Sequence, residues 1–312
     1  MNYKWEDSIQ LETLKNQKVL VAGGTGFIGK RFIEYLEKNE IETYVISRRK
    51  LEDKKYITYL NADLNDKEVL NLLGKKYKFD KLVYLAANIP LANAKKETYQ
   101  DAVDSTLIPF VNFCTAFVHE NCKLIYASSV DVLGNCNVNN YTEEVKPNVA
   151  TPYGLAKYCG EFYATAICSK IGAKCLMYRF SQVYGPKEPV VRVIPILVNA
   201  IVNEKPFEIW TDGHEKRRFL YVDDAVQSLA LGLTKDIVGV YNIAGEEIIT
   251  MIDLVTKIEN VFEKKLDYKI LSKVVGNDNV PDIIKAKTEL GYLPEVDMNF
   301  GIEMVKDGVL NE

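Results

Sequence analysis

Short apolar runs alternate with segments of helical periodicity along the first part of the chain. The apolar runs predict strands at residues 19–22, 43–46, 57–60, 81–85, 123–126 and 174–179, and helices are predicted between them at 29–39, 67–73 and 106–120 and from Pro152 onward. In the first helix Phe32, Ile33 and Leu36 recur with a period of about 3.6 residues. Strands that alternate with helices through short connections predict an α/β fold with a doubly wound parallel sheet and right-handed crossovers.

The periodicity weakens after about residue 185, where turn residues separate predicted helices near 192–204, 222–234 and 250–263. The pattern therefore predicts a main α/β domain at 17–185, with later returns to its sheet, and a smaller lobe made mainly by 186–312. Residues 1–16 form an N-terminal extension, whose Trp5, Ile9 and Leu14 are expected to pack on the body.

The clearest candidate for chemistry is the stretch KVLVAGGTGFIG at residues 18–29, in which a buried strand leads through glycines into a helix. Gly23 permits the tight turn, Gly26 leaves room for phosphates beside the backbone, and Gly29 lets the helix pack closely on the strand. Free N–H groups and the positive end of the helix dipole favour an anion there. This order of elements predicts a dinucleotide-binding site, to which Phe27 and Ile28 of the same turn also belong.

Composition and charge narrow the class of protein. Of the 312 residues 47% are hydrophobic and 26% are charged, which supports a sizeable core and an ordered chain. The net charge of −4 argues against nucleic acid as the main partner. No run approaches the roughly 18 apolar residues that span a bilayer, and the polar N-terminus lacks the apolar core of a signal peptide. We therefore expect a soluble cytoplasmic protein with no membrane partner.

Cysteine and histidine usage gives no metal-binding pattern. The six cysteines are irregularly spaced without a C-x-x-C pair, and there are only two histidines. Because several cysteines lie in apolar helical or strand-like runs, buried free thiols are expected and no metal site is predicted.

A candidate proton relay follows the glycine turn in sequence. Tyr153 and Lys157 are four residues apart on one predicted helix, so they share a face. A phenol with a pKa of about 10 becomes a useful base at neutral pH when a nearby cation favours the phenolate, and Lys157 carries such a charge. Lys157 is also expected to donate hydrogen bonds to a nicotinamide ribose, so Tyr153 and Lys157 are predicted cofactor contacts as well. Ser129 lies at the carboxyl end of a predicted strand, where open α/β sheets bind their ligands. Together the three residues predict proton transfer to and from a substrate oxygen.

These residues and further motifs resemble the extended short-chain dehydrogenase/reductase family, and within it the nucleotide-sugar epimerase/dehydratase branch. The resemblance covers about residues 17–305, and its motifs occur in the order GGTGFIG (23–29), ADLND (62–66), YLAA (84–87), YASSVDVLG (126–134), PYGLAK (152–157), RFSQVYGP (179–186), RRFLYVDDA (217–225), YNIAG (241–245) and DIIKAKTELGY (282–292). It implies a Rossmann-type dinucleotide-binding domain at 17–185 and a substrate-binding lobe at 186–312.

The resemblance also assigns roles by position. Ser129, Tyr153 and Lys157 match the family's catalytic serine or threonine, tyrosine and lysine. Asp63 and Leu64 match the family's adenine contacts. Ala86 and Ala87 match the family's turn beside the pyrophosphate and ribose. Arg217 falls where the family grips the substrate diphosphate, a role that suits a guanidinium fork.

The turn after the second predicted strand departs from the family. Members that prefer NAD usually carry an acidic residue there for the ribose 2′-hydroxyl, whereas this chain has Ser47, Arg48 and Arg49. A hydroxyl and two guanidinium groups suit a 2′-phosphate, so NADP is the predicted cofactor and NAD the alternative. The other interpretation is a solvated basic turn, since lysines follow at 50, 54 and 55.

Further departures concern the substrate. Asp131 stands where related dehydratases and decarboxylases often have a catalytic acid, but Val130 precedes it instead of the second acid of a 4,6-dehydratase. Asp131 therefore either takes part in the site by orienting a sugar hydroxyl or only caps a turn. Gln182 replaces the family's asparagine. The second arginine that the family often has before its C-terminal helix is missing, and Asn277 and Asp278 stand in that region instead. Arg192 is a candidate substitute for the missing arginine.

Three functions remain open at this stage. The first is NAD(P)-dependent epimerisation of a nucleotide-diphosphate sugar, most simply at C4, through a transient ketone. The second is NADPH-dependent reduction of a 4-keto sugar nucleotide, which the two arginines favour. The third is a non-catalytic NADP-binding sensor, against which the intact serine, tyrosine and lysine argue. The resemblance also implies a homodimer through the helices of 106–120 and 152–169, with Leu107, Phe110, Val111, Cys114, Phe162 and Ala166 as candidate contacts.

Overall fold

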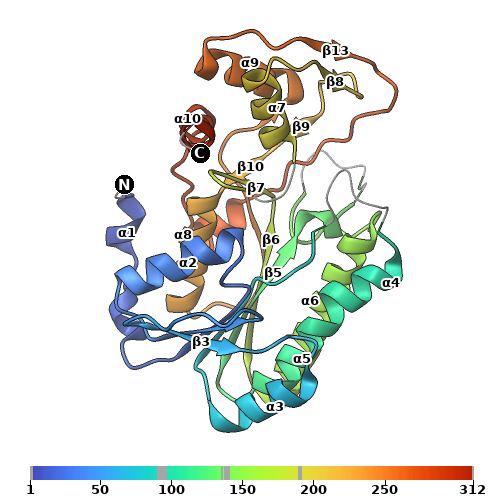
Figure 1. Cartoon of the computed structure of the whole chain (residues 1–312). Helices are drawn as coiled ribbons and strands as arrows, with labels where there is room; N and C mark the ends of the chain where they lie inside the picture. Colours follow the sequence, from blue (N-terminus) through green and yellow to red (C-terminus); the bar gives the residue numbers. More distant parts are fainter. Residues whose placement is uncertain (1–2, 90–96, 135, 137–140, 189–191, 311–312) are drawn as a thin grey trace.

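The computed structural model describes residues 3–89, 97–134, 136, 141–188 and 192–310. Its centre is a seven-stranded parallel sheet in the order β11-β6-β5-β4-β1-β2-β3 (Figure 1). The strands are β1 (Val19–Ala22), β2 (Thr43–Ser47), β3 (Ile57–Asn61), β4 (Lys81–Tyr84), β5 (Lys123–Ser129), β6 (Lys174–Phe180) and β11 (Gly239–Ile243). The predicted doubly wound α/β fold is confirmed.

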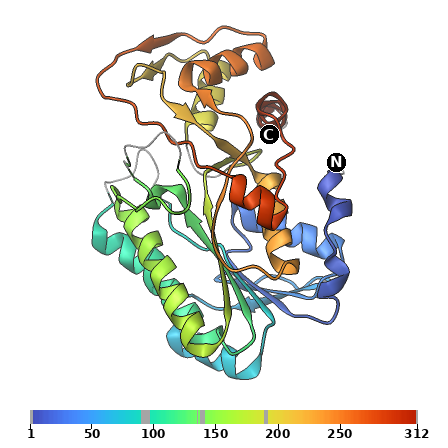
Figure 2. The same cartoon turned by 180° about the vertical axis from the view of Figure 1, so that it is seen from behind.

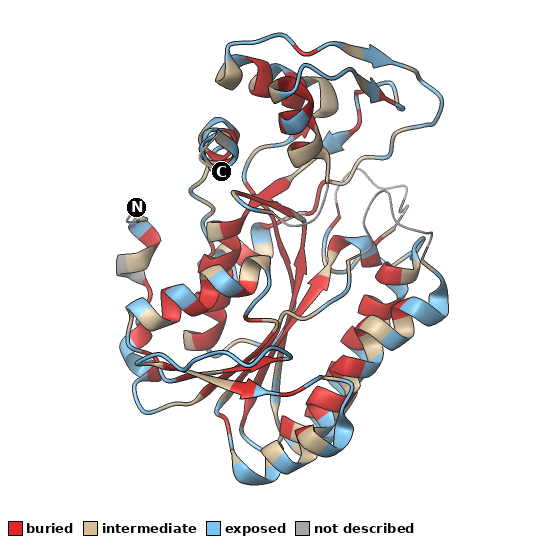
Figure 3. Ribbon diagram, viewed as in Figure 1, coloured by how far each residue is buried: buried red, intermediate tan, exposed pale blue. Residues whose placement is uncertain are grey.

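Helices cover both faces of the sheet (Figures 1 and 2). One face carries α2 (Phe27–Lys38) and α8 (Val222–Thr234), and the other carries α3 (Lys67–Lys76), α5 (Ile108–Phe117) and α6 (Pro152–Ile171). Successive strand residues point to opposite faces, so Val19 and Val21 join one core cluster while Leu20 joins the other. Figure 3 shows the strands and the inward sides of these helices as the most buried parts of the molecule. Burial on both faces explains the near-continuous apolar runs of the sequence.

The contact between β1 and α2 leaves no room for side chains. A Cβ atom at Gly29 would lie 2.1 Å from the Gly23 carbonyl oxygen, closer than any real contact. Gly23 itself has a φ of +84°, and a Cβ there would meet the Ala86 nitrogen at 2.6 Å. Glycine is therefore required at both positions for the first strand, the turn and the helix to pack as they do.

The helix predicted at 106–120 begins earlier in the structure, contains a wide turn near its start and ends at Phe117. Helix α4 (Tyr99–Ala102) continues through a wide turn at Val103–Leu107 into α5, and the Ile108 N–H bonds the Val103 carbonyl five residues back. Pro109 has no N–H to donate in the first turn of α5, which suits a helix start rather than a helix interior. The wide turn places Ser105 and Pro109 at the carboxyl ends of the sheet strands, where both residues line a pocket.

The other helices and strands lie mainly beyond the carboxyl ends of the sheet strands (Figure 1). Paired strands are β7 (Gln182–Tyr184) with β10 (Phe219–Tyr221), β8 (Phe207–Ile209) with β13 (Tyr268–Ile270), and β9 (Lys216–Arg217) with β12 (Ile249–Thr250). The helices of this region are α7 (Val193–Val202), α9 (Met251–Phe262) and α10 (Met298–Leu310). Between β6 and β11 the chain leaves the sheet for this region and comes back.

The N-terminal extension folds against the body. Helix α1 (Lys4–Ser8) is followed by a helical turn at Leu11–Leu14, and Trp5, Ile9 and Leu14 are buried as predicted. All six cysteines are free, as expected, and three of them are buried: Cys114, Cys122 and Cys168. Among the described residues no helix combines the length and apolar character needed to cross a membrane.

We expect Gly29→Ala to destabilise the protein by about 1–3 kcal/mol or more, because overpacking this contact forces the backbone apart. Chemical denaturation measures the loss. The matched control is Gly26→Ala, where the nearest atom to a new Cβ is 3.2 Å away and φ is negative, so the loss should be smaller. Equal stability of Gly29→Ala and wild type would contradict the packing described.

Candidate active site

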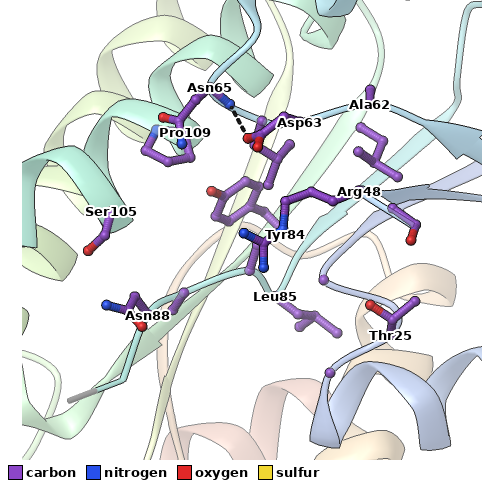
Figure 4. Close-up of a pocket in the computed structure, with 17 residues that line it drawn as sticks. Thr25, Arg48, Ala62, Asp63, Asn65, Tyr84, Leu85, Asn88, Ser105 and Pro109 are labelled. Atoms are coloured by element: carbon purple, nitrogen blue, oxygen red, sulfur yellow. Dashed lines mark hydrogen bonds between the residues drawn. The ribbon is translucent and has the colours of Figure 1, made fainter. Parts of the chain in front are cut away.

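A pocket of about 530 Å³ lies at the carboxyl ends of β1, β2, β3 and β4 (Figure 4). The strand order reverses between β1 and β4, and open α/β sheets bind ligands at such a point. Of the predicted cofactor contacts, eight line the pocket: Gly23, Gly26, Ser47, Arg48, Asp63, Leu64, Ala86 and Ala87. The structure thus brings together residues from four separate stretches of sequence.

Hydrogen bonds fix the loop after β3 at one end of this pocket. The Asp63 carboxylate accepts the backbone N–H of Asn65 at 2.9 Å, as Figure 4 shows. From α5, the side-chain amide of Asn112 donates to the Leu64 carbonyl at 3.0 Å. The loop therefore presents Asp63 and Leu64 from a fixed backbone.

The two predicted arginines after β2 differ in position. Both residues are exposed, but Arg48 lines the pocket, where Figure 4 shows its side chain reaching toward Tyr84 at the centre, and Arg49 is not among the lining residues. Asn61, at the end of β3, donates its side-chain amide to the Arg48 carbonyl at 2.9 Å, and the Ser47 hydroxyl accepts the Arg49 N–H at 3.2 Å. These bonds hold the turn so that Ser47 and Arg48 face the pocket.

Besides Arg49, five predicted cofactor residues do not line this pocket: Phe27, Ile28, Gly29, Tyr153 and Lys157. Phe27 and Ile28 are half-buried in the first turn of α2, and Gly29 packs on β1. Lining residues that sequence reasoning missed are Thr25, Ile46, Ala62, Asn65, Tyr84, Leu85, Asn88, Ser105 and Pro109. Ala62, Asn65, Tyr84 and Leu85 lie within motifs quoted from the sequence, and Asn88 directly follows one, so position in or beside a motif was an available signal. Ser105 and Pro109 come from the wide helical turn, which the apolar periodicity does not reveal.

The three predicted catalytic residues lie on β5 and on the first two turns of α6. Ser129 ends β5, and its hydroxyl accepts the Asp131 N–H at 3.1 Å. Helix α6 begins at Pro152 because Thr151 caps it, accepting the Gly154 N–H at 3.0 Å. This start puts Tyr153 in the first turn and Lys157 one turn later.

Lys157 is 2% exposed, and its ammonium group donates to the Ala127 carbonyl of β5 at 2.6 Å. Burial lowers the pKa of Lys157 to about 7, and Glu161 opposes that change. The Nζ atom lies 5.8 Å from the centre of the Tyr153 ring. The helix spacing therefore brings the pair close, as expected.

The electrostatic effect on Tyr153 differs from the sequence-based expectation. Burial raises the pKa of Tyr153, the Asp131 carboxylate raises it further, and the cation that lowers it is Arg192. Lys157 does not act as the activating cation here, because its amine is directed to the Ala127 carbonyl and is itself dehydrated. In this structure the phenol is protonated at neutral pH.

Charged residues predicted for the substrate side gather near Tyr153. Arg192 lies 3.8 Å from Glu188, a buried carboxylate that sequence reasoning missed although it stands four residues earlier. Burial raises the pKa of Glu188 to about 7, and Arg192 opposes it. Arg217 donates to the Asn277 carbonyl at 3.4 Å.

Asp131 has exposed surface, but its carboxyl is largely surrounded by protein, and this burial raises the pKa of the carboxyl. The charges of Arg192 and Arg217 and the hydrogen bond with Ser129 lower it. The positive charges of Arg192 and Arg217 thus both act on the Asp131 carboxylate. Gln182 is half-buried at the start of β7 and makes no side-chain hydrogen bond with the described residues.

The sequence model of the NAD dependent epimerase/dehydratase family matches residues 19–244. The chain belongs to this family. It is therefore an enzyme of the NAD-dependent nucleotide-sugar group that includes epimerases, dehydratases and reductases.

Relatives in this epimerase/dehydratase family include proteins of different activity. The chain is 28% identical to a dTDP-D-glucose 4,6-dehydratase of Dictyostelium discoideum over 78% of its own length and 62% of that relative. It is 27% identical to the dTDP-4-dehydro-6-deoxyglucose reductase of Escherichia coli, over 91% of this chain and 95% of the relative. The UDP-glucose 4-epimerase of Thermotoga maritima, solved with UDP-glucose, is 25% identical with a TM-score of 0.82, over 94% of this chain and 99% of that one.

We expect the buried Lys157 to make stability depend on pH. Its pKa is about 7 in the folded protein against 10.5 for a free lysine side chain, so the unfolded chain binds more protons between these values. The free energy of unfolding of wild type should rise across that range relative to Lys157→Met, by up to about 1.4 kcal/mol per pH unit. Urea titrations from pH 6.5 to 9.5 measure the difference.

The control for this prediction is Lys170→Met, which changes an exposed lysine on the same helix. Its stability curve should run parallel to that of wild type. A constant gap between wild type and Lys157→Met at every pH would show that Lys157 keeps its charge when folded.

Proposed function

We propose that the protein catalyses oxidoreduction at a carbon of a nucleotide-diphosphate sugar, and that the reaction is C4 epimerisation through a transient ketone. The observation that carries this proposal is that Ser129 ends β5, the neighbour of β4 at the dinucleotide pocket, while Tyr153 and Lys157 lie on α6, where Lys157 bonds the Ala127 carbonyl of β5. Similarity over almost the full chain to a UDP-glucose 4-epimerase supports it. Val130, which stands where a 4,6-dehydratase has its second acid, argues against the dehydration seen in other relatives.

The pocket suits a dinucleotide in shape and chemistry. Gly26 leaves space beside the backbone, Arg48 offers a cation, and the Ser105 hydroxyl is buried in the wall without a hydrogen-bond partner among the described residues. A bound nicotinamide dinucleotide supplies the hydride acceptor of the reaction. Asp63 and Leu64 would hold its adenine end, and the Gly23–Gly26 turn its phosphates.

The chain's own groups would move the proton. We assign to Tyr153 removal of the proton from the sugar hydroxyl and its return, with the Ser129 hydroxyl bonded to the same oxygen. Lys157 would turn from the Ala127 carbonyl to a cofactor ribose, where its charge also favours the Tyr153 phenolate. Asp131 is proposed to orient a neighbouring sugar hydroxyl.

The substrate diphosphate is proposed to bind the lobe of residues 186–312. Arg217 and Arg192 both act on the charge of Asp131, so they border the same space as the catalytic groups. Two guanidinium groups suit a diphosphate. Gln182 is retained as a candidate substrate contact on the strand that leads into this lobe.

A second candidate, NADPH-dependent reduction of a 4-keto sugar nucleotide, is favoured by Ser47 and Arg48 at the pocket. A reductase must exchange its cofactor after each turnover, whereas an epimerase retains NAD. The similarity to the Escherichia coli reductase supports this candidate. NAD is supported instead by the similarity to the UDP-glucuronic acid 4-epimerase of Bacillus cereus, which was solved in complex with NAD and is 25% identical with a TM-score of 0.82.

We also propose a homodimer through α5 and α6, with a changed set of contacts. Phe110 and Cys114, two of the predicted contacts, are fully buried against the sheet and leave the interface. Leu107 and Val111 are half-buried, while Phe162, 62% exposed, and Ala166 face outward on α6. An apolar side chain exposed to this degree supports association at that face.

We expect Tyr153→Phe to lose at least about 100-fold in turnover while cofactor affinity survives, since only proton transfer is removed. Incubation with NAD and UDP-glucose, followed by NMR of the sugar C4 configuration, measures turnover. The control is Tyr158→Phe, on the same helix but with its ring packed edge-to-face against Phe162. Near-normal activity of Tyr153→Phe would exclude the assigned role, and no interconversion of any UDP-sugar by wild type would exclude the epimerase.

We expect Arg48→Ala to weaken NADP binding by about 10-fold or more and NAD binding little, because only NADP has a phosphate for this charge. Arg49→Ala should change neither affinity, since it does not line the pocket. Isothermal titration of both variants with both cofactors tests the pair. Equal loss of NAD and NADP affinity in Arg48→Ala would remove the support for NADPH and for the reductase.

A further inference from the structure

A second pocket, of about 310 Å³, lies where the N-terminal extension meets the rest of the molecule. Its walls come from the extension, α2, α8 and α10, with Pro186 at one side. Neither the cofactor nor the substrate of the proposed reaction requires this space.

Aromatic rings form one part of the wall. Tyr3 and Trp5 stack with ring centres 5.8 Å apart, and Tyr35 of α2 packs against Trp5 at 5.2 Å. Trp5 is only 5% exposed, so the extension presents it inward rather than to solvent. The faces of such rings attract cations as well as apolar groups.

Charged groups form the rest of the wall, and carboxylates are in excess. Glu6 pairs with Lys38 at 2.7 Å, and Asp223 accepts the Tyr3 hydroxyl at 2.7 Å and lies 3.9 Å from Arg31. Both basic groups of the pocket are therefore already paired with its own acids.

Glu34 is the carboxylate left over. It is exposed at the rim and makes no hydrogen bond or ion pair with the described residues. It therefore remains available to an incoming cation.

The Tyr35 hydroxyl is a second unsatisfied group at this pocket. The residue is 7% exposed, and the hydroxyl is enclosed without a hydrogen-bond partner among the described residues. Burial and Glu6 raise the pKa of Tyr35, which keeps the hydroxyl protonated. A buried hydroxyl without a partner is uncommon in native proteins and calls for an explanation.

We infer that this pocket is a binding site for a small organic amine in its ammonium form. The ammonium group pairs with Glu34 at the rim, and the apolar body rests on the rings of Tyr3 and Trp5 in the lining. The ligand displaces the side chains that now enclose the Tyr35 hydroxyl, so that this hydroxyl hydrogen-bonds to the ammonium group. The site depends on the N-terminal extension, which supplies Trp5, and it gives that extension a role beyond packing.

Tryptophan fluorescence tests the inference directly. The chain has two tryptophans, and Trp210, which is 55% exposed, can be replaced by Phe so that Trp5 alone reports. Titration of Trp210→Phe with 2-phenylethylamine at pH 7 should give a saturable change in emission. The neutral analogue 2-phenylethanol has the same shape without the charge and should bind at least about 10-fold more weakly, a difference of about 1.4 kcal/mol.

Two variants in the Trp210→Phe background complete the test. Glu34→Gln should weaken 2-phenylethylamine binding by about 5-fold or more, while Glu37→Gln, which removes a carboxylate paired with Lys54 one turn along the same helix, should leave it unchanged. Absence of saturation, equal affinity for amine and alcohol, or equal affinity of wild type and Glu34→Gln would each overturn the inference. None of these readouts involves turnover, so they are independent of the proposed epimerase.

Discussion

The contact between β1 and α2 is the constraint on which the rest of the structure depends. Because the Gly23 carbonyl and Gly29 touch without side chains, the helix begins directly above the strand end. Its free N–H groups then face the turn at Gly26, and the neighbouring strand β4 can pass close enough for Ala86 to border the same space. The pocket at the ends of β1 and β4 follows from this one close approach.

Burial, more than pairing, sets the electrostatics of the reactive groups. Tyr153 and Lys157 are both dehydrated, so each is driven toward its neutral form, the phenol with a raised pKa and the amine with a lowered one. Arg192 and Asp131 act on Tyr153 with opposite sign. A phenol in such surroundings becomes an effective base only when bound partners rearrange the nearby charges, which ties proton transfer to the filling of the site.

Most of the fold could be predicted from the sequence because strands buried on both faces leave plain apolar runs. The earlier helix start at Tyr99 and the wide turn at Val103–Leu107 could not, since these residues are mostly polar and precede the apolar stretch that predicted the helix. Spacing found Tyr153 and Lys157 but not the effects of Asp131 and Arg192 on Tyr153, because burial and charge depend on neighbours distant in sequence. Likewise the sequence does not distinguish Arg48 from Arg49, because which side chain faces the pocket depends on the backbone of the folded turn.

The sheet takes its last strand from far along the chain. Strand β11 lies beside β6 although about sixty residues separate them, and α8, which covers one face, lies in that interval. A fragment ending after β6 would leave an apolar edge and an uncovered face. The lobe of residues 186–312 is therefore not a separate segment at the end of the chain. A chimera that exchanges this lobe must cut the chain at several junctions. Changing individual loops is therefore a more direct route to a new specificity than exchanging whole segments.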